Sequence, residues 1–179
     1  MLFRSAIKTA FLKENSFARI LDLTYDRLPS DEQKITIKLE IDTAPPEGSH
    51  FANAFLTYPY PFSILVQDMS SLFASKCHAL LCRRYEKGRD WFDFLWYISK
   101  KTVINHLLLK NALYQAGPYK GQILPYSKKW LQEQFEKKIA SLDWKAAQRD
   151  VENFLRLEER KFIENWSAEL FQSQLEKIE

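Results

Sequence analysis

KGRDWFDFLWYI, residues 87–98, reads as a helix that is apolar almost all the way round. From Asp90 onward, helical spacing places Asp90, Asp93 and Tyr97 on one face, with aromatic and aliphatic side chains on the adjoining sides. Such a helix is expected at the centre of a core. Two carboxylates on a buried helix are costly unless they meet cations, hydrogen-bond donors or a metal. A purely structural interpretation stays open, in which both acids cap neighbouring loops or pair with nearby arginines: Arg83, Arg84 or Arg89.

Strand signals precede this helix, and helix signals lie on either side of it. Residues 34–42 are the clearest strand, because apolar and polar side chains alternate along them. Weaker strand patterns cover residues 6–13, 21–25, 51–58 and 62–66. Helical spacing begins at Asp68, and it predicts helices over residues 68–84, from 90, over 103–115, from 127, from 143 and over 158–177. Either Ser70 or Asp68 is expected to cap the first of these helices, and Ser127 and Asp143 are expected to cap those that begin there. Strands first and helices afterwards predict an α+β fold, with a sheet in residues 1–68 and a helical domain in 69–179.

The last predicted helices carry apolar stripes that are most simply core. The stripe of the helix that begins at Asp143 contains Trp144, Ala147, Val151, Phe154 and Leu155. The stripe of the final helix contains Phe162, Ile163, Trp166 and Leu170. Helical spacing alone predicts that all of these side chains point inward.

The composition of the 179 residues, 46% hydrophobic with a net charge of +3, suits an ordered globular protein. Positive charge is concentrated in residues 76–101, which hold seven basic and three acidic side chains. Such a cluster favours a phosphate-bearing ligand, or is simply a solvated basic face.

The two cysteines and three histidines form no disulfide framework or zinc pattern, and no apolar run is long enough to span a bilayer. No signal-peptide pattern occurs either, so we expect a cytoplasmic protein.

Three further side chains are candidates for chemistry. Glu40 and Asp42 lie two residues apart on the strand 34–42, so both carboxylates project the same way. They suit a divalent cation that bridges nucleotide phosphates, but equally an exposed polar face paired with Lys38. Lys76 lies in a helix beside apolar neighbours, where its ammonium either binds phosphate or extends to solvent.

Two motifs resemble those of the AbiEii/AbiGii-type nucleotidyltransferases, the toxins of abortive-infection and type IV toxin–antitoxin systems. The first is SSLFASKCHALLCR, residues 70–83, and the second is KGRDWFD, residues 87–93. Residues 37–42, IKLEID, also look like the carboxylate-bearing strand of that family. The resemblance is good over residues 34–105 and loose elsewhere.

The resemblance implies a partial nucleotidyltransferase-like mixed β-sheet followed by a C-terminal helical domain. It implies transfer of a nucleotide from a nucleoside triphosphate, with Mg²⁺, to an acceptor such as tRNA, and a cognate antitoxin as partner. Asp90 and Glu40 would be the catalytic acids, and Glu40 and Asp42 would lie at the metal. The residues beside the triphosphate would be Lys76, Lys87 and Arg89, with Asp93 bracing the site.

One part of the family pattern is missing from this sequence. A glycine-rich turn followed by a D-x-D strand has no counterpart, since no glycine precedes Gly48 and no D-x-D occurs. The chain is therefore expected to correspond to the C-terminal portion of such an enzyme, truncated and catalytically impaired, with an open sheet edge that favours homo-oligomers. Two other functions remain open: a non-enzymatic RNA- or protein-binding module that uses residues 76–101, and a metal-dependent nuclease that uses Glu40 and Asp42.

Overall fold

The computed structural model describes residues 7–14 and 35–178, and it is mixed α+β as predicted. The chain divides into two compact units, Met1–Pro45 and Pro46–Glu179. The division after residue 68 that the sequence suggests stays a prediction. Among the described residues, each sheet consists of one antiparallel pair of strands, and no parallel pairing occurs there.

The first unit contains an antiparallel hairpin of two eight-residue strands. Strand β1 (Ile7–Glu14) pairs with β2 (Ile35–Asp42) along its whole length, with Ile7 opposite Asp42 and Glu14 opposite Ile35. Both strands lie within one residue of the ranges predicted from alternating apolar side chains. The strand predicted at residues 21–25 lies outside the described residues.

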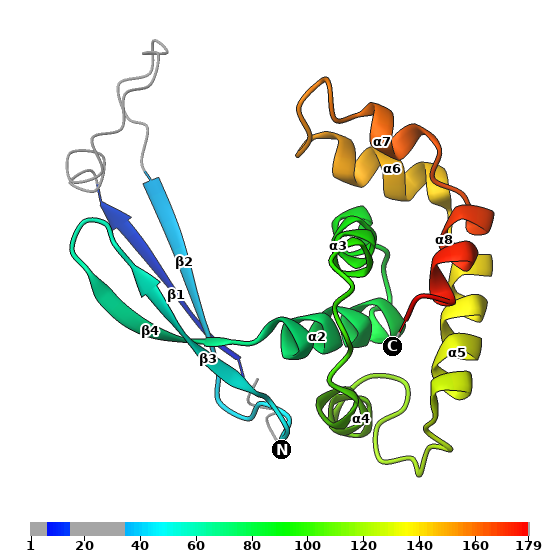
Figure 1. Cartoon of the computed structure of the whole chain (residues 1–179), viewed down its shortest axis with the longest axis horizontal. Helices are drawn as coiled ribbons and strands as arrows, with labels where there is room; N and C mark the ends of the chain where they lie inside the picture. The colour runs from blue at the N-terminus through cyan, green and yellow to red at the C-terminus, as the bar shows by residue number, and fades with distance from the viewer. Residues whose placement is uncertain (1–6, 15–34, 179) are drawn as a thin grey trace. The chain divides into compact units, whose positions relative to one another are not determined.

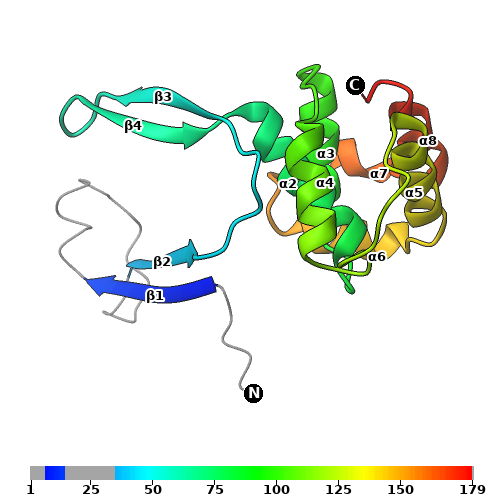
Figure 2. The ribbon, with the colours of Figure 1, turned by 90° about the horizontal axis from the view of Figure 1, so that it is seen from below.

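The second unit begins with another hairpin and continues as seven helices (Figure 1). Strand β3 (Phe51–Leu56) pairs with β4 (Phe62–Gln67), again antiparallel. The helices are α2 (Met69–Cys82), α3 (Gly88–Ser99), α4 (His106–Gln115), α5 (Lys128–Ala140), α6 (Trp144–Glu152), α7 (Lys161–Glu164) and α8 (Ala168–Leu175). Figure 2 shows this helical part from a second direction.

Most of these helices begin at a side chain that accepts a hydrogen bond from an N–H of the first turn. Asp68, Ser127 and Asp143 cap α2, α5 and α6 in this way, as the sequence predicts. Two further caps are Asn105 at α4 and Ser167 at α8. Asn105 is buried, and it also donates to the carbonyl of Gly48 (2.7 Å) and to Ser71 Oγ (3.0 Å), so it ties three segments together.

Helix α3 lies in the core, as its apolar sequence predicts. Trp91 and Phe94 are fully buried. The Trp91 ring packs edge-on against Phe94, Trp144 and Phe171, which joins α3 to α6 and α8. The start of α3 approaches α6 so closely that a Cβ atom on Gly88 would lie 1.9 Å from the carbonyl oxygen of Ala147. Only glycine fits there.

The C-terminal third departs from the predicted helices in two places. Helix α6 ends at Glu152, and Phe154 lies in the turn that follows, 61% exposed rather than inward. The helix predicted over 158–177 is two helices, because the Ser167 hydroxyl accepts from Leu170 N–H and restarts the helix there. Phe162, on the short α7, is consequently 72% exposed, whereas Ile163 and Trp166 are buried as predicted.

Candidate functional site

A cluster of oppositely charged side chains joins α2 to α3. Lys76 Nζ lies 3.1 Å from Asp90 Oδ1 and 2.6 Å from Asp93 Oδ2. The other oxygen of Asp90, Oδ2, accepts a hydrogen bond from the Arg83 guanidinium. The Asp90 side chain is only 8% exposed, while its two cationic partners are about one-third exposed. A nearly buried carboxylate is thus paired on both oxygens, as its desolvation requires.

The sequence positions each member of this cluster. Lys76 and Arg83 lie seven residues apart along α2 and its C-terminus, so both side chains reach the same side. Asp90 lies in the first turn of α3, where the helix dipole favours a negative charge. The link between the two helices is fixed to α5, because Lys138 Nζ lies 2.7 Å from Glu86 Oε1 and donates to the Arg83 carbonyl at 3.4 Å.

The environment of Lys76 keeps its side chain protonated. Burial works to lower the pKa of Lys76, but hydrogen bonds to Asp93 and Asp90 outweigh it, so the pKa lies above its ordinary value. The ammonium therefore remains a cation throughout the neutral range. It is available to an anionic ligand that competes with the two carboxylates.

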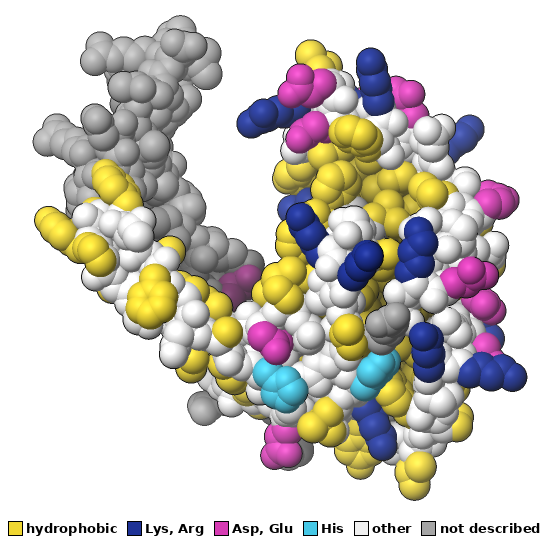
Figure 3. Space-filling view, in the orientation of Figure 1, with side chains coloured by type: hydrophobic (Ala, Val, Ile, Leu, Met, Phe, Trp, Pro, Cys, Tyr) yellow, Lys and Arg dark blue, Asp and Glu magenta, His cyan; other side chains and the backbone are white. Residues whose placement is uncertain are grey.

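These residues line a cavity of about 420 Å³ with two unlike walls. One wall is charged and carries Lys76, Arg83, Lys87, Arg89, Asp90 and Asp93. The other wall is apolar and comes from the end of α6 and the turn after it, with Val151, Phe154 and Leu155. On the face of the helical part that Figure 3 shows, apolar side chains in yellow also lie beside basic side chains in dark blue. The volume falls within the range of small-molecule sites.

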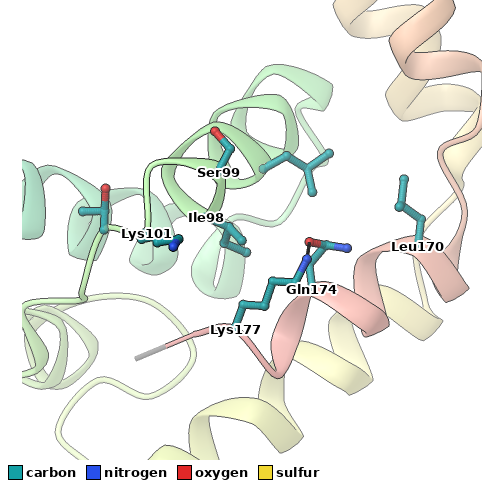
Figure 4. A pocket seen from close by; sticks show the side chains of 8 residues that line it. Ile98, Ser99, Lys101, Leu170, Gln174 and Lys177 are labelled. Atoms are coloured by element: carbon teal, nitrogen blue, oxygen red, sulfur yellow. Dashed lines mark hydrogen bonds between the residues drawn. The ribbon is translucent and has the colours of Figure 1, made fainter.

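A larger cavity, of about 740 Å³, lies elsewhere and contains none of the predicted site residues. Its lining comes from the C-terminal end of α3 and from α8, including Ile98, Lys101, Leu170 and Lys177 (Figure 4). Lys177 Nζ donates to Gln174 Oε1 there at 2.8 Å. No carboxylate lines it, so the smaller cavity is the better candidate for chemistry.

The structure thus brings five of the predicted site residues into one cavity: Lys76, Lys87, Arg89, Asp90 and Asp93. Glu40 and Asp42 lie on β2 in the other unit, and both are exposed. Their assignment to the same site stays a prediction. The sequence predicts Arg83 only as a structural partner, although its seven-residue spacing from Lys76 is a usable signal. It does not predict the apolar wall, because helical spacing places Phe154 and Leu155 in the core.

The carboxylates of Glu40 and Asp42 suit a Mg²⁺ ion better than the carboxylate of Asp90 does. Mg²⁺ binds through one or two carboxylates together with substrate phosphates. Glu40 and Asp42, two apart on a strand, are a donor pair of that kind, whereas both oxygens of Asp90 already meet cations. No group of three or more His, Cys, Asp or Glu side chains that could hold a metal occurs within residues 7–14 and 35–178.

Comparison with known proteins identifies the family. A family model described as "Nucleotidyl transferase AbiEii toxin, Type IV TA system" matches residues 3–175. The chain belongs to the AbiEii nucleotidyltransferase toxin family. No curated protein and no solved structure matches the chain.

Membership of the AbiEii family fits the resemblance first seen at residues 70–93. It implies a nucleotidyltransferase toxin of a type IV toxin–antitoxin system, with a nucleotide substrate and a cognate antitoxin. The helices of the described residues include none with the length and apolarity that a membrane crossing requires.

Proposed function

We propose that the cavity between α2, α3 and the end of α6 binds the triphosphate of a nucleoside triphosphate for nucleotidyl transfer. The observation that carries this proposal is the position of Lys76, held between Asp90 and Asp93 at the edge of the cavity. Four cations and two carboxylates line the same space, which leaves a surplus of positive charge for a polyanion. Membership of the AbiEii family supports the reaction class.

Nucleotidyl transfer makes clear what these cations would do. An acceptor hydroxyl oxygen bonds to the α-phosphorus and gives up its proton to solvent water. The bond from that phosphorus to the bridging oxygen of the β-phosphate breaks, and pyrophosphate leaves. The developing charge on pyrophosphate is stabilised by fixed cations, and we assign this role to Lys76 and Arg83. Both oxygens of Asp90 meet these cations, so we assign to Asp90 the role of holding them in place.

Mg²⁺, when bound, would supply further neutralisation of the phosphates. Its sequence-predicted ligands, Glu40 and Asp42, lie in the first unit, and their part in this site stays a prediction. The sequence contains no D-x-D pair to complete the metal ligands. We infer that this chain by itself binds nucleotide better than it transfers it. The acceptor we propose is an RNA such as tRNA, in the cytoplasm, where both substrates occur.

Isothermal titration with GTP and with CTP, each with Mg²⁺, tests the nucleotide site. Lys76→Ala removes a charged contact to phosphate, so affinity is expected to fall about 10- to 100-fold. Lys110→Ala, an exposed lysine of α4 outside the cavity, is the matched control and should leave affinity unchanged. The proposal is wrong if the wild type binds no more tightly than the Lys76→Ala, Asp90→Ala double variant.

A second candidate function is a non-enzymatic RNA-binding module. The basic surplus in residues 76–101 and the missing D-x-D pair favour it. Binding of tRNA would then weaken steeply as salt rises, because phosphate contacts release counterions. Tight tRNA binding with no nucleotide binding would favour this candidate over the transferase, and salt-independent or absent tRNA binding would remove it.

We also propose that two copies of the chain associate through an open edge of the β3–β4 hairpin. The β3–β4 hairpin has only two strands among the described residues, and it exposes large apolar side chains, including Phe51, Phe55 and Leu65. Open edges with apolar side chains favour pairing between chains. Sedimentation velocity across a hundredfold concentration range tests this, and a monomer throughout would contradict it.

A further inference from the structure

Phe154 is an exposed aromatic ring at a position that packing does not explain. It lies in the turn after α6, where its N–H donates to the Val151 carbonyl at 2.9 Å. The ring is 61% exposed, yet it lines the 420 Å³ cavity. The Arg89 guanidinium lies over it, with Cζ 4.4 Å from the ring centroid. The ring and the cation therefore form a cation–π contact at the cavity wall, and the ring remains largely open to solvent.

The two walls of the cavity match the two halves of a nucleotide. Lys76 and Arg83 are suited to phosphate, as argued above. The apolar part of the lining offers a flat aromatic face and the aliphatic side chains of Val151 and Leu155, which phosphate does not need but a nucleobase does. Aromatic rings and guanidinium planes both stack on bases.

We propose that Phe154, with the Arg89 guanidinium lying over it, is the binding platform for the nucleobase of the nucleotide. This inference rests on the proposed function, since the triphosphate must occupy the charged wall for the base to reach the apolar one. Stacking uses the flat face that all bases share. The platform therefore contributes affinity for nucleotides over inorganic phosphates, and it does not choose among bases.

The chain offers a matched control for this platform. Phe162, on α7, is also a phenylalanine, is 72% exposed and does not line the cavity. Because both rings are largely exposed, truncating either one removes little buried surface from the core. Circular dichroism of each variant verifies that the helices are retained.

The experiment compares GTP with inorganic tripolyphosphate by isothermal titration on the full chain. Phe154→Ala is expected to weaken GTP binding about tenfold and to leave tripolyphosphate binding unchanged within about twofold. Phe162→Ala should change neither affinity. Phe154→Tyr should retain GTP affinity, whereas Phe154→Leu, which is apolar but has no aromatic face, should not.

The outcomes separate this inference from the proposed function. If Phe154→Ala weakens GTP and tripolyphosphate equally, or leaves GTP unchanged, the platform is wrong while a Lys76-dependent triphosphate site still stands. If Phe154→Leu binds GTP as tightly as the wild type, apolar contact alone accounts for the contribution of this wall to GTP affinity. The proposal that Phe154 stacks on the base is then wrong. If the wild type binds neither ligand, both proposals fail together.

Discussion

Gly88→Ala tests whether the contact between α3 and α6 is as close as the structure shows. An alanine Cβ would lie 1.9 Å from the Ala147 carbonyl oxygen and 2.9 Å from its carbonyl carbon, whereas ordinary contact begins at 3.4 Å. The obstacle is backbone, so no side-chain rotation relieves it and α3 must move away from α6. Overpacking of this kind costs about 1–3 kcal/mol and occasionally more.

Two opposing effects decide the sign of the change in stability. Alanine in place of glycine favours a helix by about 1 kcal/mol. The clash at Ala147 is severe, so its cost should lie at or above about 3 kcal/mol, the upper end of the usual range. The free energy of unfolding should therefore fall by about 2 kcal/mol or more.

Urea denaturation followed by circular dichroism at pH 7 measures this change. Ser99→Ala, at the exposed end of the same helix, is the control and should alter the free energy of unfolding by less than about 0.5 kcal/mol. Because α6 leads to the apolar wall, Gly88→Ala should also weaken GTP binding. A Gly88→Ala variant as stable as the wild type would refute the reasoning, since helix propensity would then have outweighed the clash.

Two further predictions concern polar groups of the second unit. Asn105→Ala removes the α4 cap, and it leaves the Gly48 carbonyl and the Ser71 hydroxyl without this partner. Urea denaturation should therefore show that the free energy of unfolding falls by about 2–4 kcal/mol. A fall below about 1 kcal/mol would contradict the assigned hydrogen bonds. Burial lowers the pKa of His78 and of His106 below the ordinary value of 6.5. As the pH falls through that value, these histidines therefore bind protons in the unfolded chain before they do so in the folded chain. Stability should therefore decline between about pH 7 and pH 5, and the His78→Gln, His106→Gln double variant should decline less steeply in the same urea titrations.

The sequence predicted those parts of the fold in which local pattern and packing agree. Helix α3 is apolar on nearly every side and is buried, and the polar caps at Asp68 and Asp143 begin helices where expected. Apolar spacing failed at Phe154, which lies beyond the end of α6, and at Phe162, which lies on an exposed side of the short α7. A hydrophobic stripe shows which face is apolar, but not where the helix stops.

The candidate site was predictable in its charged half only. Helical spacing places Asp90 and Asp93 on one face, but only the resemblance to the family placed Lys76 at the same site, and the distances show that the three side chains lie together. The apolar wall comes from residues about 60 positions later in the chain, and no local pattern connects them. Glu40 and Asp42 lie in the first unit and the cavity in the second, so their link to this cavity stays a prediction.

The double pairing of Asp90 has a consequence for the speed and selectivity of ligand capture. A free lysine or arginine side chain loses roughly 2 kcal/mol of rotational freedom when it is immobilised. Here Asp90 restrains Lys76 and Arg83 during folding, so an arriving polyanion meets cations that are already aligned. A ligand with a single negative charge gains little by displacing the resident carboxylate, whereas a chain of phosphates can contact both cations at once. We therefore expect the cavity to bind chains of phosphates in preference to chloride.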